Sequence, residues 1–297
     1  MGLRPGALCP PLAEQATRLG GKMPFREAAD EVRRSARVAV SASTVHRLTR
    51  NVGTDVVAIN VAEEERLQRD LPPPPPGSAA KVLCPDGAML RTRERGWCEV
   101  KTLAIGEPVT DADSGETHTT ALSYVSRLAG IEAFSSAVLP ELHRRGVESA
   151  ALVQVLGDGA GWIDTLAAEH CPRAVRTVDF WHGSERLGAI GHAIYGATMP
   201  KGWLERQCHT LKHDGPRTLL RRLARTAARH GARAATEADR TYLRTRQGQM
   251  DYPRYRQLGL PIGSGSGESA HAVVWQGRMK GPGMFWAERT VKRVSTP

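Results

Sequence analysis

The sequence predicts an α/β fold built on a mixed β-sheet, and three observations support this prediction. Residues 149–187 alternate twice between a short apolar run, an acidic turn and a helical pattern. Three β-like segments and one helical pattern precede this stretch, over residues 79–146. The chain of 297 residues is 40% apolar, which is enough to bury one large core or two modest ones.

In chain order, residues 24–53 predict two short helices joined by a turn. Ser41 or Ser43 can cap the second helix, and Gly53 can end it. Helix-turn-helix domains use this arrangement to enter a DNA major groove. Four side chains of the second helix would face the DNA: Thr44, His46, Arg47 and Arg50. The alternative is plain helical packing with the arginines in solvent.

Five consecutive prolines, residues 72–76, mark the clearest domain boundary. A charged, helical continuation over residues 56–69 precedes them, and the prolines exclude a helix and favour an extended segment. We therefore predict a helical N-terminal DNA-binding module over residues 1–70, a proline-rich linker over 71–78 and an α/β domain over 79–297.

The α/β domain is predicted to begin with a β-hairpin. Residues 81–90, which include Asp86, and residues 96–108 are β-like and are joined by a charged turn. Residues 117–127 supply a third strand, and 131–146 supply a helix. This order fits an antiparallel meander beside which the later strands add in parallel.

Acidic residues follow both of these later strands. The apolar runs 150–156 and 174–178 lead to Asp158 and Asp179, and His182 comes soon after. Open α/β sheets bind ligands at the carboxyl ends of their strands, so these side chains are candidates for a catalytic site. The alternative is that the two aspartates only cap the helices that follow.

Asp86 and Asp158 project side by side if their strands are neighbours. Two carboxylates at such a distance repel each other unless a cation neutralises them. A hard divalent ion with oxygen ligands is the cation that such a pair holds.

A basic helical stretch at about residues 196–256 is predicted to form an all-helical insertion in the α/β domain. Leucines and alanines make a narrow apolar stripe, and arginines crowd the other faces. The arginines predicted to contact DNA phosphates are Arg221, Arg222, Arg225 and Arg229. The alternative is a solvated helix face.

A glycine-rich and serine-rich segment follows, over residues 260–286. It lacks the Lys of a phosphate-binding loop and the spacing of a nucleophilic serine elbow. Ser266 can cap a helix that carries Glu268 in its first turn, and Arg278 and Lys280 form a basic end. The alternative role for Glu268 is to complement the helix dipole.

Charge and cysteine usage limit the possible functions. Lys and Arg number 41 against 31 Asp and Glu, a net charge of +10 that favours a polyanionic partner. The five cysteines are scattered and form no CxxC pair, which predicts neither a disulfide framework nor a zinc cluster and favours a reducing compartment. No apolar run is long enough to span a bilayer and no signal peptide is evident, so we predict a soluble protein without a membrane partner.

Four motifs in order carry a resemblance to a known family: DGAML with WCEVKTLAIG, then GDGAGWI, VDFWHGSERL and PIGSGSGESAHAVVWQGRMKGPGMFW. Together they resemble bacterial insertion-sequence transposases of the DDE type, in particular the ISKra-type group. The N-terminal stretches PLAEQATRLGGKMPFREAADEV and SASTVHRLTRNVG resemble the helical region of the same group. The resemblance covers most of the chain.

The resemblance implies an RNase H-like catalytic domain that cleaves and joins DNA strands at the ends of an insertion sequence. Its three acids would be Asp86, Asp158 and Glu268, holding two Mg²⁺ or Mn²⁺ ions about 4 Å apart. Asp179 and His182 would line the site, and whether Asp158 or Asp179 is the second acid is left open. The expected partner is double-stranded DNA, bound by a homodimer or higher oligomer in the nucleoid of the bacterial cytoplasm.

Two departures from the family pattern are evident. Pro85 stands in a strand where relatives continue without proline, and proline removes a ladder hydrogen bond. The chain ends at residue 297 without the closing helical stretch of relatives, which predicts a truncated copy. The rival functions are a non-catalytic DNA-binding regulator or remnant derived from a transposase, and a nuclease of RNase H-like fold that cuts without joining.

Overall fold

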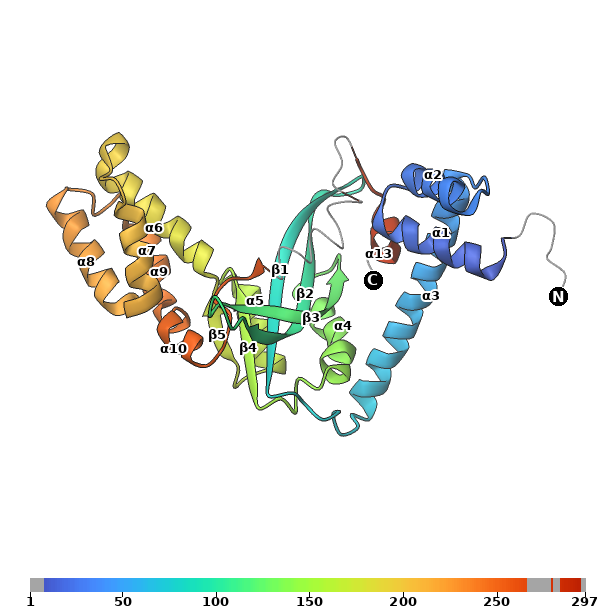
Figure 1. Ribbon diagram of the computed structural model, residues 1–297, viewed down its shortest axis with the longest axis horizontal. Helices are drawn as coiled ribbons and strands as arrows, with labels where there is room; N and C mark the ends of the chain where they lie inside the picture. The colour runs from blue at the N-terminus through green and yellow to red at the C-terminus, as the bar shows by residue number, and fades with distance from the viewer. Residues whose placement is uncertain (1–7, 266–278, 280–283, 295–297) are drawn as a thin grey trace.

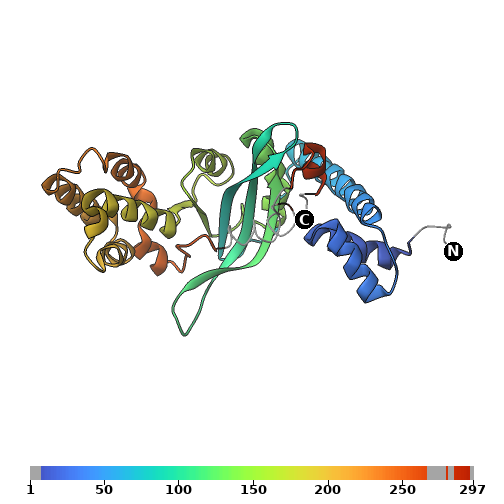
Figure 2. The same ribbon diagram turned by 90° about the horizontal axis from the view of Figure 1, so that it is seen from above.

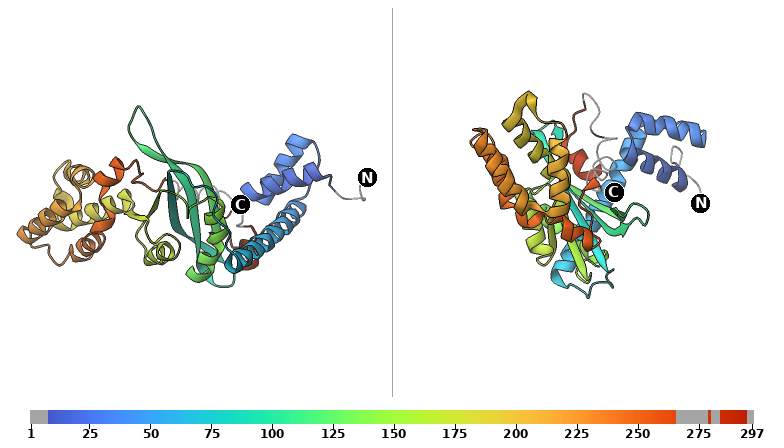
Figure 3. Two further views of the ribbon diagram at one scale, coloured as in Figure 1. Left: turned by 90° about the horizontal axis from the view of Figure 1, so that it is seen from below. Right: turned by 60° about the vertical axis from the view of Figure 1, so that its left-hand side comes forward.

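The computed structural model describes residues 8–265, 279 and 284–294. In it a central sheet separates two groups of helices (Figure 1). Helices α1 to α3 lie at one end and α7 to α10 at the other, and the views from above and below show the same elongated order (Figures 2 and 3). None of the helices in the described part of the chain is long and apolar enough to cross a membrane.

The N-terminal helices are α1 (Pro10–Lys22), α2 (Phe25–Ala36) and α3 (Ala42–Arg69). They enclose a small core of mostly alanine and valine side chains, Ala16, Ala28, Ala29, Val32 and Val45. Gly20 lets α1 approach α3, because a Cβ there would fall 2.8 Å from Val45. The three helices therefore pack as one unit, and this is the close approach that glycine permits.

Helix α3 begins where the sequence predicted but does not end there. The Ser41 hydroxyl caps it by accepting from the Thr44 amide at 3.1 Å. The expected end at Gly53 is wrong, since α3 runs on to Arg69. Glycine inside a helix costs about 1 kcal/mol relative to alanine, and the buried position of Gly53 indicates that packing offsets this cost.

The sheet has the predicted topology. Its strands are β1 (Ala80–Thr92), β2 (Gly96–Thr110), β3 (Thr117–Arg127), β4 (Leu152–Gly157) and β5 (Val175–Val178), in the order β3-β2-β1-β4-β5. β1, β2 and β3 are antiparallel neighbours, whereas β4 adds in parallel to β1 and β5 in parallel to β4. The fold is thus α/β with a mixed sheet.

Helices α4 (Ile131–Arg144) and α5 (Gly161–His170) cover one face of the sheet. Their side chains, including Phe134, Val138 and Leu166, form one core with Leu83 and Val155 of the strands. Because side chains alternate along a strand, the neighbours of Leu83 in β1 and of Val155 in β4 point to the opposite face of the sheet. On that face Gln154 donates to the Thr177 hydroxyl at 2.9 Å.

Pro85 lies in the central strand β1, as the sequence required. It pairs with Leu103 of β2, but the parallel pairs between β1 and β4 end at Leu83 and Val155, two residues earlier. Proline has no N–H to donate to β4, which explains why the ladder stops at this point. The residue after it, Asp86, is therefore released from pairing with β4.

Helix α6 (Phe180–Tyr195) leads from β5 into the helical end of the molecule. There α7 (Trp203–Asp214), α8 (Pro216–Arg229), α9 (Glu237–Thr245) and α10 (Tyr252–Gln257) pack around a core that includes Leu187, Leu211, Leu219, Leu223 and Tyr252. We call α7 to α10 the helical subdomain. It occupies the stretch predicted as an all-helical insertion, and Leu219, Leu223 and Ala227 are buried as the apolar stripe predicted.

After α10 the chain returns to the sheet. The Pro261 carbonyl accepts from Gln154 at 2.9 Å, and the Ile262 carbonyl accepts from the Phe180 amide at 2.9 Å. Near the end of the chain, α13 (Glu288–Val294) packs against α3, and Trp286 forms a parallel bridge with Thr92 at the tip of β1. The last described segment therefore joins the N-terminal helices to the sheet.

Candidate active site

Asp158 directly follows β4, which pairs with β1, the strand that carries Asp86. The two strands pair in parallel with Leu83 opposite Val155, and Asp86 and Asp158 each lie three residues after this last pair. The sequence predicted this juxtaposition on the condition that the two strands are neighbours, and the pairing meets that condition.

The next strand brings Asp179 to the same edge. β4 and β5 pair with Gly157 opposite Val178, so Asp158 and Asp179 are the next residues of their strands. The Asp179 amide donates to the Gly157 carbonyl at 2.7 Å, which holds the two turns together. Asp158 and Asp179 thus directly follow the adjacent parallel strands β4 and β5, at the edge where α/β sheets bind ligands, whereas Asp86 lies within β1.

The turn that carries Asp158 is tightly constrained by glycines. A Cβ on Gly157 would fall 2.7 Å from Ile163 and 3.1 Å from the Pro85 carbonyl oxygen, and Gly159 has a φ of +79°. Asp158 itself is half-buried, and its Oδ1 accepts from the Ala160 amide at 2.8 Å. It is not the N-cap of α5, because that position belongs to Ala160.

Two side chains of the helical subdomain clamp this turn, and no pattern in the sequence predicted either contact. The Tyr242 hydroxyl donates to the Asp158 carbonyl at 2.6 Å, and the Arg246 guanidinium donates to the Gly159 carbonyl at 2.6 and 3.1 Å. The guanidinium of Arg246 also lies over the Tyr242 ring at 4.3 Å, and that of Arg186 lies over it at 4.7 Å. The helical subdomain therefore positions Asp158.

Asp179 occupies a very different environment. It is only 2% exposed, and it caps α6 because its Oδ1 accepts from the Trp181 amide at 2.6 Å. Its Oδ2 accepts from the Ser264 amide. Burial would raise the pKa of Asp179, but His182 and the donors of Ser264 and Trp181 outweigh burial and hold this pKa below its ordinary value. The capping role that the sequence left open is thus confirmed for Asp179.

His182 stands one turn into α6, beside both later aspartates. Its Nδ1 lies 3.9 Å from Asp179 Oδ1, too far for a hydrogen bond, so the interaction is electrostatic. The Asp179 carboxylate is the main cause that raises the pKa of His182, and the Asp158 carboxylate adds a smaller effect in the same direction. The two carboxylates therefore favour the protonated, positively charged form of His182.

Asp86 is half-buried in β1, and its Oδ1 accepts from the Gly87 amide at 2.7 Å. On β2, opposite Gly87, the buried Lys101 forms an ion pair with Glu99 and lies 5.1 Å from the centre of the Trp162 ring. Trp162 belongs to α5, directly after the Asp158 turn. A lysine of β2 and an aromatic ring of α5 thus lie close to each other.

Glu268 lies outside the described residues, as do Arg278 and Lys280. The described chain before Glu268 ends at Gly265, one residue after Ser264, whose amide binds Asp179. Within the described ranges, no three His, Cys, Asp or Glu side chains lie together as a metal-binding group. The donor chemistry of half-buried carboxylates nevertheless fits a hard divalent ion.

No protein-family model matches the chain, and no curated protein matches it. The fold and the residues described above are therefore the basis for assigning a function.

The side chains predicted to contact DNA take different positions. Arg47 and Arg50 are exposed on α3, whereas His46 is half-buried and its ring lies 4.8 Å from that of Phe25. On α8, Arg221, Arg225 and Arg229 are exposed. Arg222 is exposed as well, and it bridges to α7 by donating to Gln207 at 2.7 Å and Thr210 at 3.1 Å.

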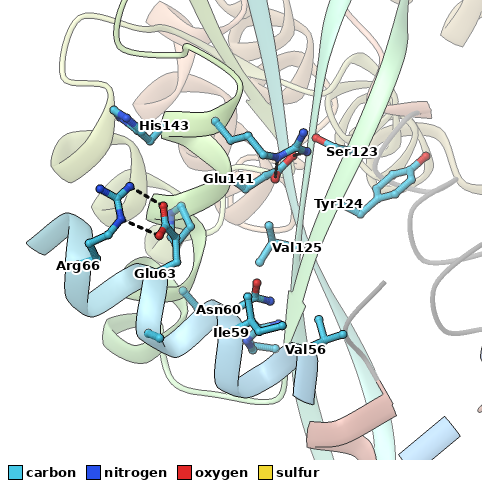
Figure 4. A pocket seen from close by; sticks show the side chains of 15 residues that line it. Val56, Ile59, Asn60, Glu63, Arg66, Ser123, Tyr124, Val125, Glu141 and His143 are labelled. Carbon is cyan, nitrogen blue, oxygen red and sulfur yellow. Dashed lines mark hydrogen bonds and ion pairs between the residues drawn. The ribbon is translucent and has the colours of Figure 1, made fainter. Parts of the chain in front are cut away.

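A cavity of about 910 Å³ lies elsewhere, between α3, β3 and α4 (Figure 4). Two of its arginines pair with acids of their own helices, Arg66 with Glu63 and Arg144 with Glu141. None of the predicted catalytic residues lines it. It marks the junction between the N-terminal helices and the sheet, and the candidate active site is the aspartate edge.

Proposed function

We propose that this protein is a DDE-type DNA transposase, which cleaves phosphodiester bonds at the ends of an insertion sequence and transfers the strands to a target. The observation that carries the proposal is the pairing of β1, β4 and β5 as adjacent strands, which supports a site shared by Asp86, Asp158 and Asp179. The mixed sheet, in which β1 to β3 are antiparallel neighbours and β4 and β5 add in parallel on the other side of β1, supports an RNase H-like domain.

The acids of this edge suit phosphodiester chemistry. Asp86, Asp158 and Glu268 would hold two Mg²⁺ or Mn²⁺ ions, which activate a water or a 3′-hydroxyl and stabilise the leaving oxygen when bound. Asp158 is kept in place by the bonds of Tyr242 and Arg246 to its turn. We assign Asp158, rather than Asp179, as the second acid, because Asp179 is buried and both of its oxygens accept backbone hydrogen bonds.

His182 and Asp179 would shape the site from the first turn of α6. With its raised pKa, His182 carries a proton on its ring over a wider pH range and so places positive charge beside the carboxylates. A phosphate group approaching Asp158 would meet this charge, which reduces its repulsion by the acids.

DNA binding would be divided between the two ends of the molecule. The exposed Arg47 and Arg50 of α3 lie after the turn between two packed helices, which supports recognition of the element's end in a major groove. The net charge of +10 supports contact with DNA phosphates. As a transposase it would act in the bacterial nucleoid, as a dimer or higher oligomer that brings two ends together.

Nicking of a DNA duplex tests the proposal. With Mg²⁺ or Mn²⁺ the parent protein should nick a duplex that carries the element's end, and Asp158→Asn should abolish nicking while it leaves binding to the duplex intact. Asp113→Asn, at an exposed acid of the β2–β3 loop, is the matched control and should nick as the parent does.

The same assay separates the rival functions. Nicking without any joined product would identify a nuclease. Binding to DNA with no nicking by the parent in either metal would identify a DNA-binding regulator and would contradict the proposed activity.

A further inference from the structure

A groove of about 610 Å³ runs between α8 and α9 of the helical subdomain. Four arginines line it, two from each helix, together with the small apolar side chains of α8 and one glutamine. The lining residues are Arg217, Leu220, Arg221, Ala224, Arg240, Arg244 and Gln247. We call it the arginine groove. The two helices lie together at the end of the molecule far from the N-terminal helices (Figures 1 and 3).

The arginines of α8 stand there because the opposite side of the helix is buried. Leu219, Leu223 and Ala227 point into the core of the helical subdomain and are at most 1% exposed. Arg217 and Arg221 are one helical turn apart and both are exposed. Two like charges at this spacing destabilise a helix slightly, and an anion bound between them would offset this cost.

Acidic side chains compensate only part of the charge. Glu237 lies 3.2 Å from Arg240 and 3.8 Å from Arg244. Among the described residues, no acidic oxygen lies within 4.0 Å of Arg217 or Arg221. The groove therefore carries an excess of positive charge, and an anionic ligand of extended shape would complement it.

The lining also indicates which anion fits. No aromatic ring lines the groove, so it offers no surface on which an unpaired base could stack. Guanidinium groups bind phosphate oxygens with two parallel hydrogen bonds, and such contacts do not depend on base sequence. We infer that the arginine groove binds the phosphate backbone of duplex DNA, an inference that rests on the proposed action on DNA.

The groove is connected to the candidate active site through one residue. Gln247, at one end of the groove, directly follows Arg246, which donates to the Gly159 carbonyl beside Asp158. A duplex held in the groove would thus be bound to the same subdomain that positions Asp158. The groove supplies sequence-independent affinity, and the α3 arginines supply recognition.

Salt-dependent binding tests this inference. The probe is a 30-base-pair duplex of random sequence, measured with the full chain in EDTA so that no cleavage occurs. The triple variant Arg217→Gln, Arg221→Gln, Arg244→Gln should reduce the slope of log K against log salt by about 2 to 3, since each lost phosphate contact removes about 0.9. Arg240 is kept because it is half-buried and paired.

Two controls make the outcome specific. The variant Arg93→Gln, Arg173→Gln, Arg254→Gln removes the same charge from exposed positions outside the groove and should change the slope by less than one contact. The variant Arg217→Lys, Arg221→Lys, Arg244→Lys keeps the charge and should keep the slope of log K against log salt. Circular dichroism and melting of each variant show whether the fold is retained.

Equal slopes for the two glutamine variants would overturn the inference, because only total charge would then matter. A second outcome would also overturn the inference. If a polyglutamate peptide binds through the groove arginines and the duplex does not, the ligand of the groove is an acidic protein segment. The salt-dependence assay needs no metal and no cleavage. If the parent does not nick DNA, the proposed catalysis is contradicted, but the test of DNA binding by the arginine groove is unaffected.

Discussion

The turns that follow β4 and β5 look alike in the sequence and differ in the structure. Each places an aspartate directly after a buried strand and before a helix. Asp179 is buried, caps its helix and binds backbone donors with both oxygens. Asp158 is half-buried, and its side chain accepts a backbone hydrogen bond from Ala160. Tyr242 of the helical subdomain holds its turn in place.

This difference assigns Asp179 a structural role, and under the proposed function it leaves Asp158 to face the chemistry. A carboxylate whose oxygens are already bound to buried amides is costly to disturb. A half-buried carboxylate on a turn that is fixed through its backbone can exchange ligands without loss of the fold. The predictions below test that division, beginning with the largest effect.

The largest expected effect is on stability, and it separates the two aspartates by the same substitution. Asp179→Asn turns an acceptor oxygen into an amino group that faces a buried N–H, which should lower the free energy of unfolding by roughly 1–3 kcal/mol. Asp158→Asn keeps an oxygen that can accept from the Ala160 amide, and it should change the free energy of unfolding by less than about 0.5 kcal/mol. Urea unfolding of both variants measures this. Equal losses would remove the distinction between the two turns.

A smaller effect is expected from the side chain that positions Asp158. Tyr242→Phe removes the bond to the Asp158 carbonyl and should cost about 1 kcal/mol of stability. If the turn must be held for catalysis, the nicking rate should fall by about tenfold at unchanged duplex affinity. Tyr195→Phe is the control, because no hydrogen bond from its hydroxyl is present among the described residues. A nicking rate unchanged in Tyr242→Phe would mean that the clamp does not position the acid.

The smallest effect concerns the charge of His182. Because its pKa is raised in the folded state, the stability it contributes is complete below the unfolded value of about 6.5 and is lost as the pH rises through the folded value. The lowered pKa of Asp179 acts in the opposite direction, with stability lost only as the pH falls through its folded value, below about 3.9.

The melting temperature should therefore fall between pH 6 and pH 8 in the parent, and this fall should be smaller in His182→Gln. His118, exposed on β3, gives a matched control in His118→Gln, which should follow the parent. An identical fall in His182→Gln and the parent would mean that His182 does not interact with the two carboxylates.

The sequence was sufficient to predict the sheet and the positions of its acids. Alternating strand and helix patterns set the order of elements, and apolar runs that end in aspartate placed Asp158 and Asp179 at the edge of the sheet. The parallel pairing of β1 with β4 then followed from the rules that govern such connections.

The clamp on Asp158 could not be predicted in this way. Tyr242 and Arg246 contact the turn across 84 and 87 residues, and no periodic pattern connects such distant positions. The sequence also could not distinguish Arg222 from the other arginines of α8, because only the packing of α7 against α8 shows that it binds Gln207. Gly53 was mistaken for a helix end because its local preference is weaker than the packing of α3.

Direct binding of Mn²⁺ tests the central claim, that Asp158 belongs to a metal-dependent catalytic edge which Asp179 supports. Calorimetric titration of the DNA-free protein should show saturable binding to the parent and to Asp113→Asn. In Asp158→Asn the affinity should fall at least tenfold, about 1.4 kcal/mol, while the melting temperature without metal stays the same. Binding of Mn²⁺ to Asp158→Asn with the affinity of the parent would contradict the account.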